Sequence, residues 1–382
     1  MEHRFRRVME GLLGVPATEG NRIDVLRNGD EIFPAMLAAI DEAEHTVDLT
    51  TYVYWTGDIA IRVAGALTER AGAGVRVRVL LDAIGAHVMD DSLIHQMEEG
   101  GCQVEWFRKP TDVKVWDAHN RTHRKVLVCD EDVAFIGGVG IAEEWEGDAR
   151  DPSEWRDTHF RVRGPAVDGL RAAFVSNWAE TGRELFDDVD RFPEQPQDGT
   201  SVVQVVQSAS QIGWSDMCTV LEGLLCLSSE YVHLTSAYFV PDERMVGALC
   251  AAAQRGVAID VLMPGEHTDK RIVQAAGEAD FEQLLDAGVR LWRYGPTMIH
   301  AKVMTVDGVA ACVGSANFDE RSMRLNEEAN LLVIDRALVA TLEEHWDSDI
   351  AVSEQIDADE WRSRGLFQRA TEAVTGLFDD EL

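Results

Sequence analysis

Apolar residues along the first half of the chain switch between helical and strand periods. They recur at helical spacing from 31 to 43 and from 59 to 73, and each such stretch is followed by a short, mostly apolar run. A turn is expected at Asn28–Asp30. The elements predicted after it are a helix at 31–43, a strand at 47–54, a helix at 59–73, a strand at 74–82, a helix at 93–99 and a strand at 103–107. Alternating helices and strands predict an α/β fold with parallel pairing.

The second half repeats this order. Its predicted elements are a helix at 220–229, a strand at 231–239, a helix at 242–254, a strand at 256–264, a helix at 281–286 and a strand at 289–294. The strand GVAIDVLMP matches GVRVRVLLD of the first half at an offset of 182 residues (256 minus 74). The repeat predicts an internal duplication, with two α/β domains related by a pseudo-twofold axis.

A stretch rich in Pro, Asp and Gln divides the two halves. It covers residues 186–200 and predicts a linker between an N-terminal domain at 1–185 and a C-terminal domain at 201–382. Residues 1–20 predict a capping helix, with an interfacial anchor as the alternative. Residues 361–378 are apolar at near-helical spacing and predict a helix packed on its own domain, with a membrane-contacting helix as the alternative.

One motif, H-x-K-x4-D, occurs twice, once in each half. Its residues are His123, Lys125 and Asp130 in THRKVLVCDEDVAFIGGVG, and His300, Lys302 and Asp307 in IHAKVMTVDGVAACVGSANFDERS. In both copies six residues separate the Asp from a small pair, Gly137-Gly138 or Gly314-Ser315. A single match to three residues is weak evidence, because it is also compatible with the polar edge of a strand. Two matching copies make a shared chemical role the better interpretation.

Strand geometry predicts how each motif is arranged. The residues after each His alternate and then run apolar, and side chains two apart on a strand share a face, so His and Lys point the same way. Asp307-Gly308 between apolar runs predicts a hairpin turn that brings Gly314-Ser315 back beside the motif. Such a loop offers backbone N–H groups to an anion.

An imidazole, an ammonium and open backbone donors on one surface suit a phosphoryl group. Lys supplies positive charge, and His attacks phosphorus or moves a proton near neutral pH. Two copies together supply two imidazoles, one to form a phosphohistidine and one to protonate the leaving oxygen. This scheme requires no metal and no cofactor, because two lysines offset the phosphoryl charge. The chain has only five lysines, and two of them lie in these motifs.

The paired motifs resemble those of the phospholipase D superfamily, and their flanking residues resemble bacterial cardiolipin synthases. The run Gly314 to Ser322 followed by LNEEAN at 325–330 is similar to the second motif of that branch. The segments WRDTH at 155–159 and GPAV at 164–167 are similar to the region after its first motif. The resemblance covers about 28–346. It implies two duplicated phospholipase D-like domains, each a mixed, largely parallel β-sheet flanked by helices, with the active site at their interface.

The resemblance also implies roles for residues around the motifs. An acidic residue in each downstream segment partners a motif histidine in this family, which gives that role to Asp157 and Glu328, with Glu327 as the rival of Glu328. By the same resemblance Gly138, Ser315 and Asn317 bind phosphate. The first copy departs from the pattern because Gly140 stands where Asn is usual. Asp130 and Asp307 follow the strands and are expected to anchor structure rather than to join the displacement.

Composition limits the partners and the compartment. A formal charge of −33 argues against nucleic acid as the main ligand, since such binding depends on basic surfaces. The six cysteines include no C-x-x-C pair and predict small core residues in a reducing compartment. No apolar run reaches the length of a membrane span, and the N-terminal apolar stretch is too short for a signal peptide. We therefore expect a cytoplasmic protein with a phospholipid substrate and peripheral contact at the inner membrane surface.

These observations predict a cardiolipin synthase-like phosphatidyltransferase that moves a phosphatidyl group between phosphatidylglycerol-type lipids. The resemblance favours His123 as nucleophile and His300 as acid and base, while the symmetry of the motifs leaves the reverse assignment open. The alternative is a phospholipase D hydrolase that uses water and releases phosphatidic acid. A nuclease is disfavoured by the charge, and a non-catalytic lipid-binding module by two intact motifs.

Overall fold

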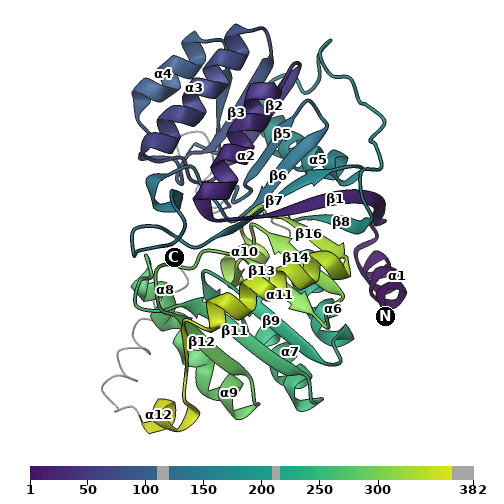
Figure 1. Cartoon of the computed structure of the whole chain (residues 1–382), viewed down its shortest axis with the longest axis vertical. Helices are drawn as coiled ribbons and strands as arrows, with labels where there is room; N and C mark the ends of the chain where they lie inside the picture. Colours follow the sequence, from purple (N-terminus) through teal and green to yellow (C-terminus); the bar gives the residue numbers. More distant parts are fainter. Residues whose placement is uncertain (110–119, 209–215, 364–382) are drawn as a thin grey trace.

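The chain folds into two halves of the same architecture, one above the other in Figure 1. The computed structural model describes residues 1–109, 120–208 and 216–363. Fifteen strands form one continuous mixed sheet, and a separate two-stranded sheet pairs β10 (Phe239–Val240) with β15 (Phe318–Asp319). The predicted duplicated α/β fold is confirmed.

The first half contributes seven strands in the order β1-β7-β6-β5-β2-β3-β4. They are β1 (Thr18–Arg27), β2 (Thr46–Thr51), β3 (Arg76–Asp82), β4 (Gln103–Phe107), β5 (Val126–Cys129), β6 (Val133–Gly137) and β7 (Thr158–Arg163). Parallel pairing runs through β2, β3 and β4, as the β-α-β pattern predicts, and the other neighbours are antiparallel.

The second half repeats this order as β8-β16-β14-β13-β9-β11-β12, with β17 added at the edge. The strands are β8 (Ser201–Gln207), β9 (Tyr231–Thr235), β11 (Ala258–Pro264), β12 (Arg290–Tyr294), β13 (Val303–Val306), β14 (Ala310–Gly314), β16 (Ala329–Ile334) and β17 (Ser353–Gln355). The strands β1 and β8 pair antiparallel and join the two half-sheets. They are equivalent in the two orders, so the duplication axis passes between them.

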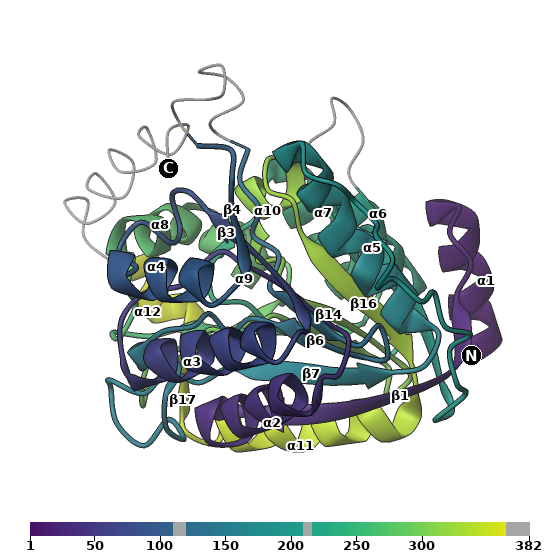
Figure 2. The same cartoon turned by 90° about the horizontal axis from the view of Figure 1, so that it is seen from above.

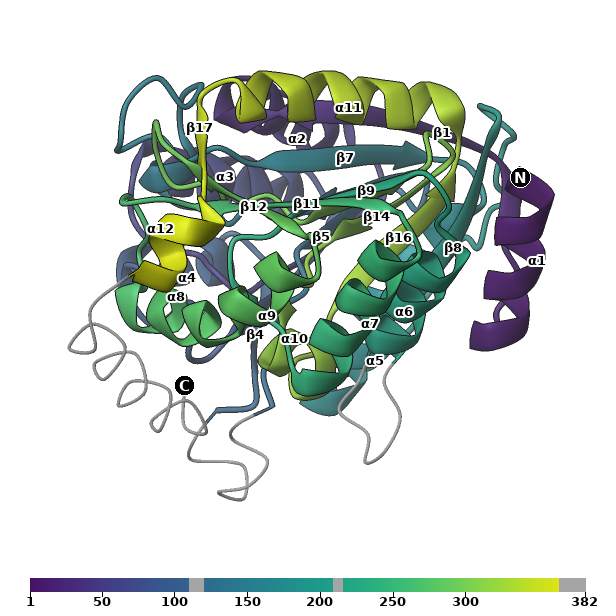
Figure 3. The ribbon, with the colours of Figure 1, turned by 90° about the horizontal axis from the view of Figure 1, so that it is seen from below.

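Helices cover the outer faces of both half-sheets. The α-helices are α1 (Glu2–Leu13), α2 (Asn28–Glu42), α3 (Asp58–Gly72), α4 (Asp91–Glu99), α5 (Ala166–Trp178), α6 (Asp216–Leu227), α7 (Glu243–Gln254), α8 (Arg271–Gly277), α9 (Phe281–Asp286), α10 (Glu320–Arg324), α11 (Arg336–Ile350) and α12 (Ala358–Ser363). Short 3-10 turns occur at Glu143–Trp145, Ala179–Thr181 and Glu278–Asp280. Figure 2 shows α2 and α5 on opposite sides of β6 and β7, and Figure 3 shows α11 on the far side of the second half-sheet from α6 and α7.

Two sequence predictions are wrong in detail. The expected turn at Asn28–Asp30 is the first turn of α2, which Asn28 enters with a φ of 57° while its backbone N–H bonds to the Asp157 carbonyl. The expected strand at 231–239 stops at Thr235, and its last residue, Phe239, begins β10, which pairs with β15 instead. In both places a long-range backbone partner overrides the local pattern.

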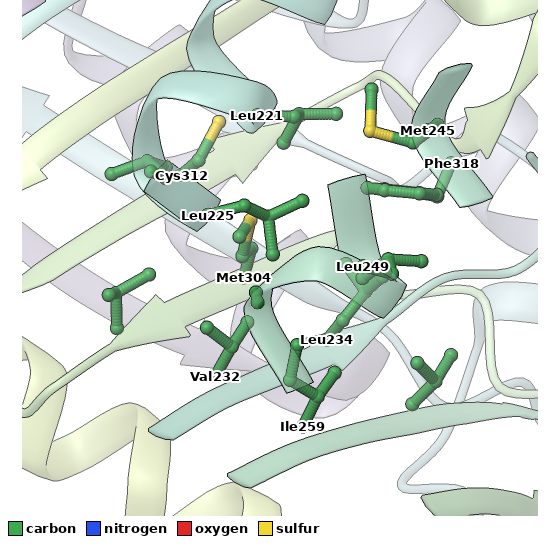
Figure 4. Close-up of a cluster of buried hydrophobic side chains, with 14 of the residues drawn as sticks. Leu221, Leu225, Val232, Leu234, Met245, Leu249, Ile259, Met304, Cys312 and Phe318 are labelled. Atoms are coloured by element: carbon green, nitrogen blue, oxygen red, sulfur yellow. The ribbon is translucent and has the colours of Figure 1, made fainter. Parts of the chain in front are cut away.

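Alternation along the motif strands divides their side chains between two cores. In β5, Leu127 and Cys129 pack in the cluster beneath α2, α3 and α4, whereas Val126 and Val128 pack in a cluster with α5 and α11. In the second half Met304 and Cys312 face α6 and α7, in the cluster drawn in Figure 4. Five cysteines are buried, as expected, but Cys226 is exposed because it lies on the outer face of α6.

The inner faces of the two half-sheets share one core. Val126 and Ile136 of the first half belong to the same buried cluster as Ala311 and Val313 of the second, and β6 contacts β14 and β16 directly. Because this core is common to both halves, it fixes their relative position and the interface on which the motifs lie.

Segments outside the repeat pack against it. Helix α1 lies beside α6 at the margin of the molecule, with Phe5 and Met9 buried in the second half's core, so the N-terminal segment forms the expected capping helix (Figures 1 and 3). Residues 186–200 contain no helix or strand, and Asp190 binds Arg76 of the first half. Most of the predicted helix at 361–378 lies outside the described residues. Within the described ranges, no helix combines the length and apolarity needed to cross a membrane.

Candidate active site

The two motifs meet at a cavity of about 190 Å3 between the halves. His123 and Lys125 reach it from the first half, and His300 and Asn317 from the second. Both histidines follow directly on residues that make β-bridges between the halves, and both lysines lie just before a motif strand. The interface site expected from the duplication is therefore present as a single cavity.

Two equivalent bridges bring the cavity together. Thr122 bridges Glu327, with the His123 N–H donating to the Glu327 carbonyl at 2.9 Å. At the related position Ile299 bridges Arg156, and the His300 N–H donates to the Arg156 carbonyl at 2.7 Å. Each bridge sets the residue before a motif histidine against the residue before an acid of the opposite half.

As a result, each histidine takes its carboxylate from the other half. His123 Nδ1 lies 2.9 Å from Glu328 Oε1, and His300 Nδ1 lies 2.9 Å from Asp157 Oδ2. All four residues are at most 7% exposed. A carboxylate at Nδ1 holds the proton there and leaves Nε2 available for chemistry. The sequence prediction paired these acids with motif histidines but did not specify this crossing.

The two carboxylates are held by different donors. Ser315 Oγ donates to Glu328 Oε2 at 2.6 Å, whereas the indole Nε1 of Trp145 donates to Asp157 Oδ2 at 2.9 Å. At Gly138, the equivalent of Ser315, a Cβ atom would lie 2.4 Å from Asp157 Oδ1. The Asp157 carboxylate therefore occupies the space that a serine side chain would need. The sequence prediction missed Trp145, although it lies between the first motif and Asp157.

The two lysines differ in their contacts. Lys125 Nζ donates to the His123 carbonyl at 3.0 Å. Lys302 Nζ donates to the His300 carbonyl at 2.5 Å and also lies 2.9 and 3.1 Å from the two ring nitrogens of His300. Among the described lysines, Lys302 lies within hydrogen-bond distance of the imidazole of His300, and none lies so close to that of His123.

Burial makes the cavity a site of shifted pKa values. Desolvation lowers the pKa of His123 to about 4, and desolvation with the charges of Lys302 and Lys125 lowers the pKa of His300 well below its usual value. Desolvation also lowers the pKa of Lys125 to about 7, with Lys302 adding to the effect, and that of Lys302 to about 8. Both imidazoles are therefore neutral at neutral pH in the empty cavity.

The two acids differ in how burial is offset. Burial raises the pKa of Asp157 despite the nearby Lys302. For Glu328, burial acts in the same direction, but His123, Lys125 and the Ser315 hydroxyl outweigh it, so the pKa of Glu328 is lowered. Burial therefore prevails at Asp157, whereas the surrounding charges and hydrogen bonds prevail at Glu328.

Asn317 has no counterpart in the first half for a steric reason. Its side chain is 3% exposed and lines the cavity, and its Oδ1 has no hydrogen-bond partner. At Gly140, the related position, a Cβ atom would lie 2.7 Å from the Val53 Cβ and 3.2 Å from the Trp145 ring. Val53 and Trp145 therefore fill the space that an asparagine side chain would need. This explains why glycine stands at position 140, where the family pattern has Asn.

The remaining acidic residues lie outside the cavity. Asp130 accepts hydrogen bonds from the backbone N–H groups that begin β2, and Asp307 accepts from the equivalent N–H groups that begin β9. Glu327, the rival of Glu328, binds Arg108 and the amide of Asn177 and does not contact a motif histidine. These positions agree with structural roles.

Aromatic side chains form one wall of the cavity. The Trp145 ring lies 5.1 Å from that of His300 in an edge-on arrangement, Trp155 lies 5.5 Å from His300, and Tyr52 lies 5.1 Å from His123. Trp55 and Tyr238 also line the cavity, whereas Tyr54 and Phe239 are core residues. The described residues contain no group of three or more His, Cys, Asp or Glu side chains placed to hold a metal.

Solved structures share this fold. The phosphatidylserine synthase of Haemophilus influenzae superimposes with a TM-score of 0.70 over 99% of this chain and 97% of that one, at 14% identity. The polyphosphate kinase of Porphyromonas gingivalis gives a TM-score of 0.59 over 88% of this chain and 49% of that one, also at 14% identity. At such identities the likeness concerns the fold alone.

Sequence comparisons are more specific. The family model described as "Cardiolipin synthase, PLD-like domain" matches residues 36–144 and 223–350. Cardiolipin synthase A of Pseudomonas fluorescens (strain SBW25) is 32% identical over 97% of this chain and 77% of its own length. The cardiolipin synthase of Listeria innocua is 30% identical over 95% of this chain and 76% of its own length. Each matched segment carries one of the two motifs that meet in the cavity. The chain therefore belongs to the cardiolipin synthase family of phospholipase D-like proteins.

Proposed function

We propose that the protein is a phosphatidyltransferase that makes cardiolipin from two phosphatidylglycerol-type lipids by way of a phosphohistidine. The observation that carries this proposal is the pair of buried imidazoles in one cavity, each with a carboxylate at Nδ1. A two-step displacement needs two such imidazoles, one as nucleophile and one to move the proton.

His123 is the better nucleophile. Its Nδ1 is held by Glu328, its pKa is about 4, and no described lysine hydrogen-bonds to its ring, so Nε2 keeps a free lone pair at neutral pH. Lys302 lies against both ring nitrogens of His300, which makes that lone pair less available. These contacts support the assignment drawn from the resemblance.

In the first step Nε2 of His123 attacks the phosphorus of a bound phosphatidylglycerol. A P–N bond forms, the P–O bond to the head-group glycerol breaks, and the glycerol oxygen takes a proton from His300. The anionic phosphodiester offsets the effect of burial and favours the protonated form of His300 in the complex. Lys125 and Lys302 stabilise the charge on the phosphoryl oxygens.

The second step reverses the first step, with a different alcohol as the attacking group. Nε2 of His300 removes a proton from a hydroxyl of the second phosphatidylglycerol, and that oxygen attacks phosphorus as the P–N bond breaks. The products are cardiolipin, glycerol and the original state of both histidines. Water in place of the lipid hydroxyl would give phosphatidic acid, which is the hydrolase alternative.

Contact with a membrane surface is part of this proposal. Three exposed apolar side chains lie next to residues that line the cavity. Ile272 precedes the lining residue Val273, and Leu325 precedes the lining residue Asn326. Ile84 precedes Gly85, whose carbonyl accepts a hydrogen bond from the lining residue Trp55. Their contact with lipid would bring the substrate to the cavity without a spanning helix.

Incubation of the purified protein with vesicles of phosphatidylglycerol, followed by mass spectrometry of lipids and assay of free glycerol, tests the function. Equal amounts of cardiolipin and glycerol support it. Phosphatidic acid without cardiolipin would establish the hydrolase instead, and no turnover of lipid would contradict both. His123→Asn and His300→Asn are the matched controls, and each is expected to abolish turnover.

A further inference from the structure

The walls of the cavity are chemically unequal. Val53, Trp55, Trp145 and Trp155 form an aromatic and apolar wall from the first half. The second half contributes a polar wall made of Asp269, Lys270, Asn317, Asp319, Arg321 and Asn326. Positions related by the repeat differ in kind, since Gly140 corresponds to Asn317 and Ala142 to Asp319 at the motif offset of 177 residues (300 minus 123). The His and Lys residues that act on the phosphoryl group are present in both halves and do not require this polar wall. The polar wall is therefore expected to contact a part of the substrate other than the phosphoryl group.

Two buried amide oxygens in the polar wall have no hydrogen-bond partner. Asn317 and Asn326 are 3% and 8% exposed, both line the cavity, and Oδ1 of each is unpaired. The Nδ2 of Asn326 lies 3.5 Å from Glu328 Oε1. An ionised carboxylate only accepts hydrogen bonds, so the amide nitrogen faces Glu328 and the carbonyl oxygen is left over.

The missing partner of these oxygens is a donor. A buried acceptor without a donor is destabilising, and a ligand that supplies the hydrogen removes that cost. Phosphate oxygens of a diester carry no hydrogen, so the phosphoryl group is not that partner. Hydroxyl groups donate, and Asp319 offers a further carboxylate on the same wall.

From these contacts we infer that Asn326, with the carbonyl oxygen of Asn317, forms a subsite for the hydroxyl groups of a polyol, and that this subsite selects glycerol-type head groups. The inference rests on the proposed function and names the feature of the substrate that the cavity recognises. The Nδ2 of Asn317 remains available for a phosphoryl oxygen, so one amide serves both groups.

One subsite serves both steps. An in-line displacement places the leaving oxygen opposite the attacking nitrogen, and the second step runs through the same geometry in reverse. The departing glycerol and the incoming glycerol hydroxyl therefore occupy the same side of phosphorus. Recognition of hydroxyls by Asn326 acts on the donor's head group and on the acceptor alike.

Alcohols with equal carbon number test the subsite. The protein is incubated with phosphatidylglycerol vesicles and either isotope-labelled glycerol or isotope-labelled propan-1-ol. Mass spectrometry then follows the transfer of each alcohol into the lipid. Wild type is expected to favour glycerol over propan-1-ol by about tenfold or more, the factor that one well-placed hydrogen bond supplies. In Asn326→Leu this preference is expected to fall by that factor. The ratio of the two exchange products is the readout, because both alcohols react with the phosphohistidine that is formed from the same phosphatidylglycerol donor.

Ser315→Ala is the matched control, because it also removes a contact of Glu328 but touches no part of the polar wall. It should slow both alcohols equally. If Asn326→Leu also slows both equally, Asn326 acts only through Glu328 and the inference fails. Equal exchange of both alcohols by wild type would refute the subsite while leaving the transferase intact, and failure to exchange any alcohol would instead refute the proposed function. A preference of wild type for ethanolamine over ethylene glycol would assign the wall to ammonium groups and overturn the choice of a polyol.

Discussion

His123 and Glu328 form a hydrogen-bonded pair at 2.9 Å although 205 residues separate them in the chain. The reciprocal pair, His300 and Asp157, spans 143 residues. Neither half contains a complete imidazole and carboxylate unit, so each catalytic proposal above depends on the interface.

Removal of the negative charge at either acid is expected to slow turnover without unfolding the protein. In Glu328→Gln and Asp157→Asn the amide no longer stabilises a proton on Nδ1, and kcat should fall by about a hundredfold or more. Glu328→Gln should also slow phosphohistidine formation, measured by rapid quench. Glu327→Gln is the matched control at the neighbouring position, and a loss of kcat there as large as in Glu328→Gln would contradict the assignment.

Alkaline pH is expected to weaken the handling of substrate. The pKa values of Lys125 and Lys302 are lowered to about 7 and about 8, so both ammonium charges disappear as the pH rises through this range. A profile of kcat/KM against pH should therefore decline above about pH 7, and the decline in kcat should lie at higher pH because bound phosphate favours the charged lysines. Lys125→Arg should shift the decline upward, because the ammonium that loses its proton first is then replaced by a permanent charge. A profile that stays flat to about pH 10 would be inconsistent with two lysines of lowered pKa.

Mild acid is expected to destabilise the fold through buried histidines. The pKa of His159, which is 2% exposed, is lowered to about 4 by desolvation. Between about pH 6.5 and 4 the unfolded chain binds a proton that the folded chain does not, so the free energy of unfolding decreases as the pH falls. One such histidine accounts for about 3 kcal/mol over that range. Urea unfolding at several pH values should give a shallower dependence for His159→Gln than for wild type, and identical slopes would disprove this account.

Restoring the usual amide in the first half is expected to be harmful. In Gly140→Asn the new side chain meets Val53 and Trp145, so the free energy of unfolding should drop by about 1 to 3 kcal/mol and activity should not rise. Asn317→Gly, the reverse change in the other half, should lower activity with little loss of thermal stability. An active and fully stable Gly140→Asn variant would show that the asymmetry is not steric.

Vesicle binding tests the proposed membrane contact. Ile272→Glu and Leu325→Glu place a charge beside the cavity, and either should reduce co-sedimentation with anionic vesicles several-fold, since a charged side chain does not enter the lipid interface. Val352→Glu is the control, because Val352 is exposed but adjoins no residue that lines the cavity. An equal effect of all three substitutions would point to general charge repulsion in this acidic chain.

Much of the fold follows from the sequence because the repeat displays each element twice. The strand at 103–107 and the helix at 281–286 are predicted with their observed bounds. The strands β1 and β8 were not predicted. They join the two half-sheets. Most of β1 is of intermediate exposure, and Gln204 interrupts the valines of β8, so neither carries the uninterrupted apolar run of a central strand.

The site was predicted by residue type but not by partnership. His123, Lys125, His300 and Lys302 are marked by spacing, and all four line or border the cavity. The crossing of Asp157 to His300 depends on a bridge between Arg156 and Ile299, a contact between distant segments that no local pattern encodes. Trp145 was missed for the same reason, because only the folded chain brings its indole to Asp157.

The crossed acids also bear on how such a protein arises from a repeat. A single half could complete its site only by meeting a second copy, and two identical copies would have to hold identical carboxylates in identical ways. Once both halves lie in one chain, that constraint is lifted, and each can change alone. Gly138 with Trp145 at the Asp157 carboxylate, and Ser315 at the Glu328 carboxylate, show such independent change: the fused chain holds its two equivalent acids by different donors.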